Sequence, residues 1–182
     1  LGSGGWHIPS NVEDIEFKNV DAGFCLVVEK DAIWERLNED KFWQKQNCIL
    51  ISTKGQAARG ARRLIRRLSE EFNLPVYVFC DSDSYGFYIY SVIKSGSMNL
   101  AYISSQIATP DAKYIGLTIK DVETYNIPKE VTIKLNNLDI KRINEMAKYP
   151  WFKKKEWQEE FKRMKEKGVK LELEALSKKG IR

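Results

Sequence analysis

Short, wholly apolar runs alternate with longer amphipathic stretches along the first half of the chain. An apolar run of four to eight residues is typical of a strand buried on both faces, and apolar residues three or four positions apart are typical of a helix. The runs expected to form strands are 23–28 (GFCLVV), 47–52 (NCILIS), 76–80 (VYVFC) and 99–104 (NLAYIS). The stretches expected to form helices are 32–39 (AIWERLNE), 57–72 and 87–94 (FYIYSVIK).

Strands that alternate with helices indicate an α/β fold, in which a mostly parallel, Rossmann-like sheet is flanked by helices. The pattern changes near Leu138, and from there three helices are expected, at 138–147, 156–167 and 170–177. We therefore expect three parts. They are a lead-in at 1–20, an α/β domain at 21–135 and a helical extension at 136–182 that packs on the α/β domain.

The composition narrows the class of protein. The chain has 182 residues, of which 43% are hydrophobic and 30% charged, with a net charge of +5. Cys25, Cys48 and Cys80 lie far apart in apolar runs and the single histidine is His7, so we expect reduced thiols in an intracellular protein and no zinc site. No apolar stretch approaches the ~20 residues that span a bilayer. The two ends carry no signal peptide pattern and suggest a piece of a longer protein.

Acidic residues follow two of the expected strands. Glu29 ends the first strand, Asp81 ends the third, and Asp83 follows two residues later. The carboxyl ends of parallel strands share one edge of a sheet, and three carboxylates there repel one another unless a cation lies among them. Mg²⁺ suits such a site because it prefers oxygen ligands. The pattern predicts a Mg²⁺ site, but it is equally typical of Asp83 or Ser84 capping a helix, with Glu29 as a solvated strand end.

Five arginines recur at helical spacing within 57–72, on the face opposite its apolar residues. We expect this helix to pack on the sheet and to present its guanidinium groups to solvent, where they would suit phosphate oxygens. Lys54, in the turn TKGQ before the helix, adds positive charge near its amino end. The alternative is a solvated face with salt bridges to Glu70 and Glu71. The residues expected to contact DNA are Lys54, Arg59, Arg62, Arg63 and Arg66.

Six segments of the chain carry a recognisable pattern. They are VVEKDAIWERL, STKGQAARGARRLIRRL and LPVYVFCDSDSYGFYIY, followed in order by YIGLTIKDV, NNLDIKRINEMAKYPWF and KLELEALSKKGI. Together they resemble the Toprim domain of topoisomerase VI A subunits and of the related meiotic double-strand-break protein. The later segments are the most specific, because other Toprim enzymes share only the Glu and the D-x-D. The sequence departs from the family pattern at Ser84 and Ala57, where proline is common, and at Ala61, where threonine is. None of these departures removes a carboxylate.

The resemblance implies that Glu29, Asp81 and Asp83 are ligands of Mg²⁺, with Mn²⁺ as a substitute. It implies the A subunit of an archaeal-type, ATP-dependent type IIB DNA topoisomerase. The nucleophilic tyrosine of the family lies upstream in a winged-helix domain, so no catalytic residue is assigned in this chain, and Tyr85 is interpreted as a packing residue. The isolated chain is therefore expected to be inactive in DNA cleavage.

The resemblance also implies partners. These are double-stranded DNA, a separate B subunit that hydrolyses ATP, and a second A subunit within an A2B2 heterotetramer. The expected location is cytoplasmic and chromosome-associated, with no membrane anchor.

Two alternatives from other classes stay open. One is a stand-alone Toprim nuclease or primase-like enzyme, which would cleave DNA with metal and no added tyrosine domain. The other is a non-enzymatic signalling domain of the phospho-receiver kind, which would accept phosphate on Asp81. That class needs an acidic pair after the first strand, whereas Glu29 is followed by Lys30.

Overall fold

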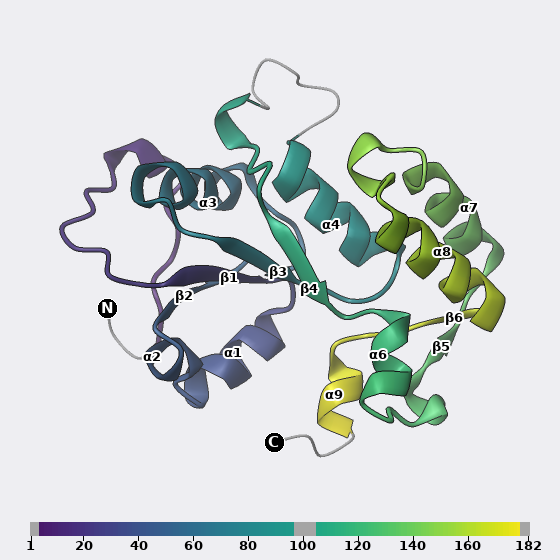
Figure 1. Cartoon of the computed structure of the whole chain (residues 1–182). Coiled ribbons are helices and arrows are strands. Elements are labelled where there is room, and N and C mark those ends of the chain that lie inside the picture. Colours follow the sequence, from purple (N-terminus) through teal and green to yellow (C-terminus); the bar gives the residue numbers. More distant parts are fainter. Residues whose placement is uncertain (1–3, 97–104, 179–182) are drawn as a thin grey trace. The chain divides into compact units, whose positions relative to one another are not determined.

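The structure, a computed structural model, describes residues 4–96 and 105–178 of the chain, shown in Figure 1. These residues fall into two compact units. The first contains the chain up to Phe79 and the segment Ile89–Ile115, and the second contains Cys80–Tyr88 and the chain from Gly116 onward. The loop with Asp81 and Asp83 therefore belongs to the second unit, whereas the strand that leads into this loop belongs to the first.

Four strands form one sheet in the described part of the chain, in the order β2-β1-β3-β4. Strand β1 lies between β2 and β3 and pairs in parallel with both, with Leu26 opposite Leu50 on one side and Tyr77 on the other. The expected α/β fold with a parallel sheet is confirmed. The strands are β1 (Phe24–Val28), β2 (Cys48–Ser52), β3 (Val76–Phe79) and β4 (Lys113–Gly116).

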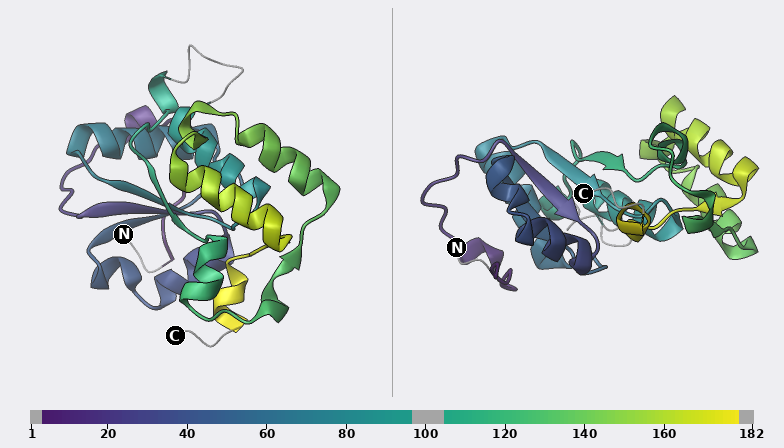
Figure 2. Two further views of the ribbon diagram at one scale, coloured as in Figure 1. Left: turned by 45° about the vertical axis from the view of Figure 1, so that its right-hand side comes forward. Right: turned by 90° about the horizontal axis from the view of Figure 1, so that it is seen from below.

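The helices of the first unit cover both faces of its sheet. Helix α1 (Asp31–Glu39) connects β1 to β2, and α3 (Arg59–Phe72) connects β2 back across β1 to β3. Because parallel connections are right-handed and these two run in opposite directions, α1 and α3 lie on opposite faces, as Figures 1 and 2 show. The short helix α2 (Phe42–Lys45) follows α1, and the 3-10 helix η1 (Val12–Asp14) precedes β1. The core of this unit includes the fully buried residues Cys25, Val27, Val28, Ile65, Val78 and Ile93.

Two elements differ from expectation around the third and fourth strands. Helix α4 (Ser84–Ser95) begins three residues before the expected start at Phe87. The strand expected at 99–104 lies outside the described residues, and β4 forms at Lys113–Gly116, which the apolar pattern did not predict. Strand β4 has four residues of mixed exposure at the edge of the described sheet, so it carries little local signal.

The second unit is mostly helical, and its expected helices at 138–147 and 156–167 are confirmed. The expected helix at 170–177 is wrong at its start, because Leu171 pairs with Ser82 instead and the helix begins at Glu174. A small antiparallel sheet joins β5 (Ile133–Lys134) to β6 (Val169–Lys170). The helices are α6 (Ile119–Thr124), η2 (Lys129–Val131), α7 (Asn137–Met146), η3 (Pro150–Phe152), α8 (Lys155–Lys167) and α9 (Glu174–Lys178).

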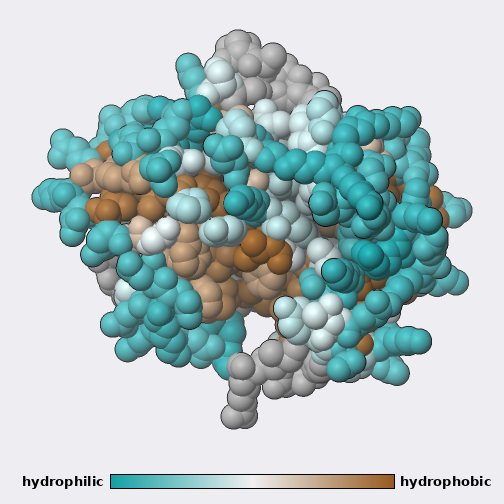
Figure 3. Space-filling model, viewed as in Figure 1, coloured by the Kyte–Doolittle hydropathy of each residue, from teal (hydrophilic) through white to brown (hydrophobic). Residues whose placement is uncertain are grey.

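An aromatic cluster forms the core of the second unit. Phe152 packs edge-on against Trp157 with ring centroids 4.7 Å apart, and Phe87 and Phe161 complete the cluster. The other side of α8 carries exposed ion pairs one helical turn apart, and Figure 3 shows hydrophilic residues covering it. Charged side chains thus cover the exposed side of this helix. No helix within residues 4–96 and 105–178 is long and apolar enough to cross a bilayer.

Candidate functional site

Glu29 lies directly after β1 in the first unit, and its side chain is buried, with 3% of the residue exposed. Its backbone is held on both sides. The Glu29 N–H donates to the carbonyl oxygen of Phe79 at 3.2 Å, and the Glu29 carbonyl oxygen accepts from the Gly55 N–H at 2.8 Å and the Thr53 hydroxyl at 3.5 Å. The end of β1 is therefore fastened to the end of β3 and to the turn that follows β2.

The turn TKGQ, between β2 and α3, places Lys54 at the surface. Lys54 and Gly55 both adopt left-handed backbone conformations, with φ of 51° and 80°, which glycine reaches at little cost. The Lys54 N–H donates to the Ser52 hydroxyl at 3.2 Å, which helps to hold the turn. Helix α3 begins five residues after Lys54, so this exposed ammonium group precedes the positive end of the helix dipole.

Asp81 and Asp83 lie on one loop of the second unit, and each carboxylate already accepts a hydrogen bond. Oδ1 of Asp81, a residue that is 4% exposed, accepts from the Leu173 N–H at 2.7 Å. Oδ1 of Asp83 accepts from the Gly86 N–H at 2.7 Å, three residues on, and so caps α4. The capping alternative is confirmed for Asp83. Capping does not exhaust the carboxylate, which has about four lone-pair sites on its two oxygens.

Two residues that hold this loop were missed by sequence reasoning. A Cβ on Gly86 would lie 2.2 Å from the carbonyl oxygen of Asp81, so the first turn of α4 fits against the loop only with glycine. A glycine three residues into a helix was the available signal. Leu173, whose N–H binds Asp81 from 92 positions away, gave no local signal.

The structure thus places the three expected ligands in two groups, with Glu29 in the first unit and Asp81 and Asp83 in the second. Among residues 4–96 and 105–178, no group of three or more His, Cys, Asp or Glu side chains is arranged to hold a metal ion. The donor set nevertheless fits Mg²⁺ by chemistry, since all three groups are carboxylates and Mg²⁺ takes oxygen ligands.

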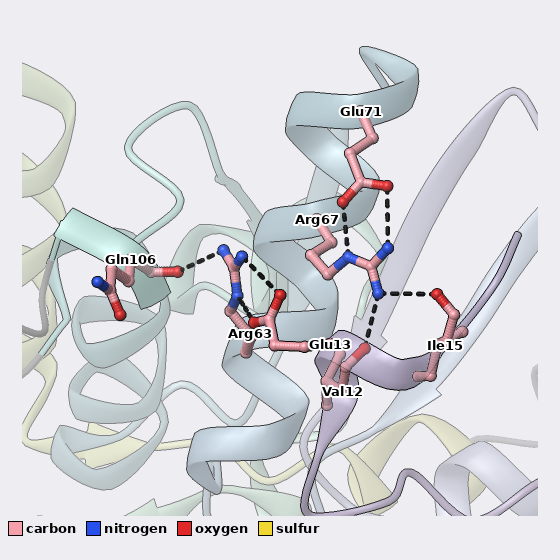
Figure 4. A network of polar contacts seen from close by, with 7 residues as sticks. All are labelled: Val12, Glu13, Ile15, Arg63, Arg67, Glu71 and Gln106. Atoms are coloured by element: carbon pink, nitrogen blue, oxygen red, sulfur yellow. Dashed lines mark hydrogen bonds and ion pairs between the residues drawn. The ribbon is translucent and has the colours of Figure 1, made fainter.

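Helix α3, which carries the five arginines, differs from expectation. Three of its guanidinium groups bind carbonyl oxygens of neighbouring segments and do not point into solvent. Arg67, with only 11% of its side chain exposed, donates to the carbonyl oxygens of Val12 and Ile15 at 2.6 and 3.0 Å (Figure 4). It also pairs with Glu71 at 2.6 Å and lies 4.8 Å from the ring centroid of Phe17. The hydrogen bond from Arg67 holds the pKa of the Glu71 carboxyl below its usual value.

Arg63 and Arg66 also each pair with a glutamate and donate to a backbone carbonyl oxygen. Arg63 forms a two-pronged ion pair with Glu13 and donates to the Gln106 carbonyl oxygen at 3.0 Å, as Figure 4 shows. The hydrogen bond from Arg63 lowers the pKa of Glu13. Arg66 pairs with Glu70 and donates to the carbonyl oxygen of Ala108 at 2.6 Å.

The expectation that all five guanidinium groups face solvent is therefore wrong for Arg63, Arg66 and Arg67. Two of their acids, Glu70 and Glu71, are those of the salt-bridge alternative. Arg59 is exposed in the first turn of α3, and Arg62 is half-buried. Of the five residues predicted to contact DNA, Lys54 and Arg59 are exposed, whereas the other three are partly buried.

A parallel α/β sheet with a glutamate after one strand and a D-x-D loop after the neighbouring strand defines a Toprim-type domain. Residues 24–182 match the family model for the Toprim domain shared by Spo11 and the topoisomerase 6 A subunits. The chain belongs to this Toprim family, as the segments that carry the resemblance indicated.

Its relatives come from the same family. The chain is 48% identical over 191 residues to the A subunit of type 2 DNA topoisomerase 6 from Pyrococcus abyssi, and this match covers 100% of the chain and 50% of the relative. The corresponding subunits from Pyrococcus horikoshii and Hyperthermus butylicus are 47% and 44% identical, over 100% of the chain and 50% and 49% of the relative. The chain thus spans about half the length of these curated relatives.

Proposed function

We propose that this chain is the Mg²⁺-binding part of the A subunit of a type II DNA topoisomerase and supports transient cleavage and religation of double-stranded DNA. The observation that carries the proposal is the position of its acids. Glu29 follows β1, and the D-x-D loop follows β3, the strand that pairs with β1 in parallel. The family match across residues 24–182 supports the same assignment.

Glu29, Asp81 and Asp83 would hold the metal ion through their negatively charged oxygens. Three carboxylates provide the oxygen ligands that Mg²⁺ needs, with Mn²⁺ as a substitute. The bound metal would supply electrostatic stabilisation of the phosphate during strand cleavage. Glu29 and Asp81 are both buried, which limits competition from water for their oxygens. The hydrogen bond that the Gly86 N–H of α4 donates to Asp83 keeps the loop in place.

The DNA contact is best supported at Lys54 and Arg59, which are exposed at the turn and at the first turn of α3. Arg62 follows on the same helix. Arg63 and Arg66 stay within the proposal as residues that shape this surface, because their guanidinium groups already bind Glu13, Glu70 and backbone carbonyl oxygens.

The whole subunit would work with partners. By family we propose a dimer of A subunits in an A2B2 assembly with B subunits that hydrolyse ATP, acting on chromosomal DNA in the cytoplasm. The stand-alone nuclease alternative is less supported, because the family match extends through the C-terminal segments that other Toprim enzymes do not share.

The test uses a full-length A subunit that contains this segment, together with its B subunit. Asp81→Asn should abolish plasmid relaxation with Mg²⁺ and ATP, and Asp111→Asn, at an exposed position outside the loop, should leave it unchanged. Calorimetry on the 182-residue chain should show weak Mg²⁺ binding that the Asp81→Asn/Asp83→Asn double variant loses. Unchanged Mg²⁺ affinity in the double variant would rule out this site.

A further inference from the structure

The acidic loop is held from both sides by backbone segments of the second unit. On one side, the Cys80 N–H donates to the Gly116 carbonyl oxygen at 2.9 Å and the Leu117 N–H donates to the Cys80 carbonyl oxygen at 2.7 Å. On the other side, Ser82 and Leu171 exchange two hydrogen bonds, of 2.8 and 3.1 Å. Residues 80–82 therefore run between two flanking segments, like a central strand.

The segment at 171–173 also contacts the Asp81 side chain directly. The Leu173 N–H donates to Oδ1 of Asp81 at 2.7 Å, a short bond between a backbone amide and a carboxylate. Such a charge-assisted bond is about twice as strong as a neutral one, so it restrains the position of Oδ1. Leu171 and Leu173 are themselves fully buried, so the amide donor has little freedom to move.

This segment is anchored at both of its ends. Just before it, β6 pairs with β5, and Lys170 binds both carboxylate oxygens of Asp139 at 3.0 and 3.2 Å. Just after it, the Ala175 N–H donates to the Glu172 carbonyl oxygen at 3.0 Å, as α9 begins. The Leu173 amide is therefore held by contacts outside the acidic loop as well as by the pairing of Leu171 with Ser82.

We infer that the segment Leu171–Leu173 is a positioning element for the metal-binding loop, with the Leu173 N–H orienting the Asp81 carboxylate. This inference rests on the proposed Mg²⁺ function of Asp81. Groups that orient a metal ligand commonly change metal affinity about 10- to 100-fold. The C-terminal segment would thus contribute to the metal site without providing a ligand.

The test removes the amide donor and keeps the side chain. In the 182-residue chain, the peptide bond before Leu173 is replaced by an ester. The ester is built into a synthetic peptide for residues 169–182, which is then ligated to the rest of the chain. A matched control carries the ester before Ala175, which removes one backbone hydrogen bond of the same segment without touching the loop. Leu173→Met, which keeps the N–H and most of the volume, is the second control.

Two measurements are made on each protein. The first is hydrogen exchange of the Ser82 amide without metal. We expect at least tenfold faster exchange in the Leu173 ester and wild-type exchange in both controls. The second is Mg²⁺ affinity by calorimetry, with Mn²⁺ binding by electron paramagnetic resonance alongside it. We expect affinity about 10- to 100-fold weaker in the Leu173 ester alone.

The outcomes separate the two claims. Wild-type Ser82 exchange and wild-type metal affinity in the Leu173 ester would overturn the inference. Equal loss of affinity in the Ala175 ester would also overturn it, because general destabilisation would then explain the effect. If the wild-type chain binds neither metal ion, the proposed function fails, while faster Ser82 exchange in the Leu173 ester alone would still support the role of the segment in holding the loop.

Discussion

Gly86 lies so close to Asp81 that a Cβ on the glycine would stand 2.2 Å from the aspartate carbonyl oxygen. The amide nitrogen and carbonyl carbon of Asp81 would lie at 3.1 and 3.0 Å, so the first turn of α4 rests on the backbone of the acidic loop. This contact is with backbone atoms, which cannot rotate away as a side chain can. The glycine therefore sets how closely the helix approaches the loop.

Gly86→Ala should destabilise the protein and disturb the loop. We expect a loss of about 1 to 3 kcal/mol in the free energy of unfolding, because the added methyl group forces the backbone apart. Urea unfolding measures this. The control is Gly23→Ala, whose added Cβ would meet its nearest atom at an ordinary 3.7 Å. Equal stability of the two variants would contradict the close contact.

Arg67→Gln should lower stability, although arginine on a helix is usually a surface residue. The change leaves the carbonyl oxygens of Val12 and Ile15 without their donor and removes the partner of Glu71. We expect a cost of about 1 to 3 kcal/mol by thermal or urea unfolding. Arg59→Gln, at an exposed position of the same helix, should cost less than about 0.5 kcal/mol. The opposite order would mean that the contacts of Arg67 do not stabilise the fold.

DNA affinity should depend on Lys54 and Arg59. Each phosphate contact that is lost should flatten the slope of log affinity against log salt by about 0.9, because fewer counterions are released on binding. The double variant Lys54→Gln/Arg59→Gln should therefore bind duplex DNA more weakly and with a shallower slope. The control with equal charge change is Lys153→Gln/Lys154→Gln, at exposed positions just before α8. An unchanged slope in the first variant would exclude this surface.

Stability should fall in acid partly through Asp139. Burial raises the pKa of Asp139, but hydrogen bonds from the Asn136 N–H and from Lys170 outweigh this, and the pKa lies below its ordinary value of 3.8. A carboxyl whose pKa is lower in the folded than in the unfolded state stabilises the fold at pH values above the unfolded-state pKa. This stabilisation is lost as the pH falls through the folded-state pKa. The melting temperature should therefore drop below about pH 4. Asp139→Asn should be less stable at pH 7, with a smaller drop in acid, and an unchanged pH profile would count against this role.

The isolated chain should form no covalent link to DNA. Residues 24–182 match the Toprim domain. We expect the nucleophilic tyrosine of the family in a separate winged-helix domain, as the resemblance implies. Incubation with plasmid and Mg²⁺, followed by a denaturing gel, should show no protein-linked DNA ends. Tyr85, interpreted from the sequence as a packing residue, is 42% exposed beside the acidic loop. If a linked end did form, Tyr85→Phe would be the first variant to examine.

Local pattern was enough to define much of the fold and the candidate acids. Strands β1, β2 and β3 and helices α1, α3, α7 and α8 follow from apolar periodicity, which each segment carries within itself. Strand alternation also places Glu29 and Asp81 at the ends of paired strands, since parallel strands end at one edge. The family segments then pointed to the Toprim fold, and the family match agrees with them.

Only the tertiary structure decided which polar groups from distant segments meet. Arg63 pairs with Glu13, which lies 50 positions away in the sequence. Because of this ion pair, a cation that was expected to face solvent instead joins two segments of the fold. The backbone N–H of Leu173 donates to Asp81, which lies 92 positions away in the sequence. Every residue except proline carries such a group, so the residue type at position 173 does not predict this contact. Apolar burial depends on a pattern repeated within one segment, whereas such a hydrogen bond depends on where two distant segments come to lie.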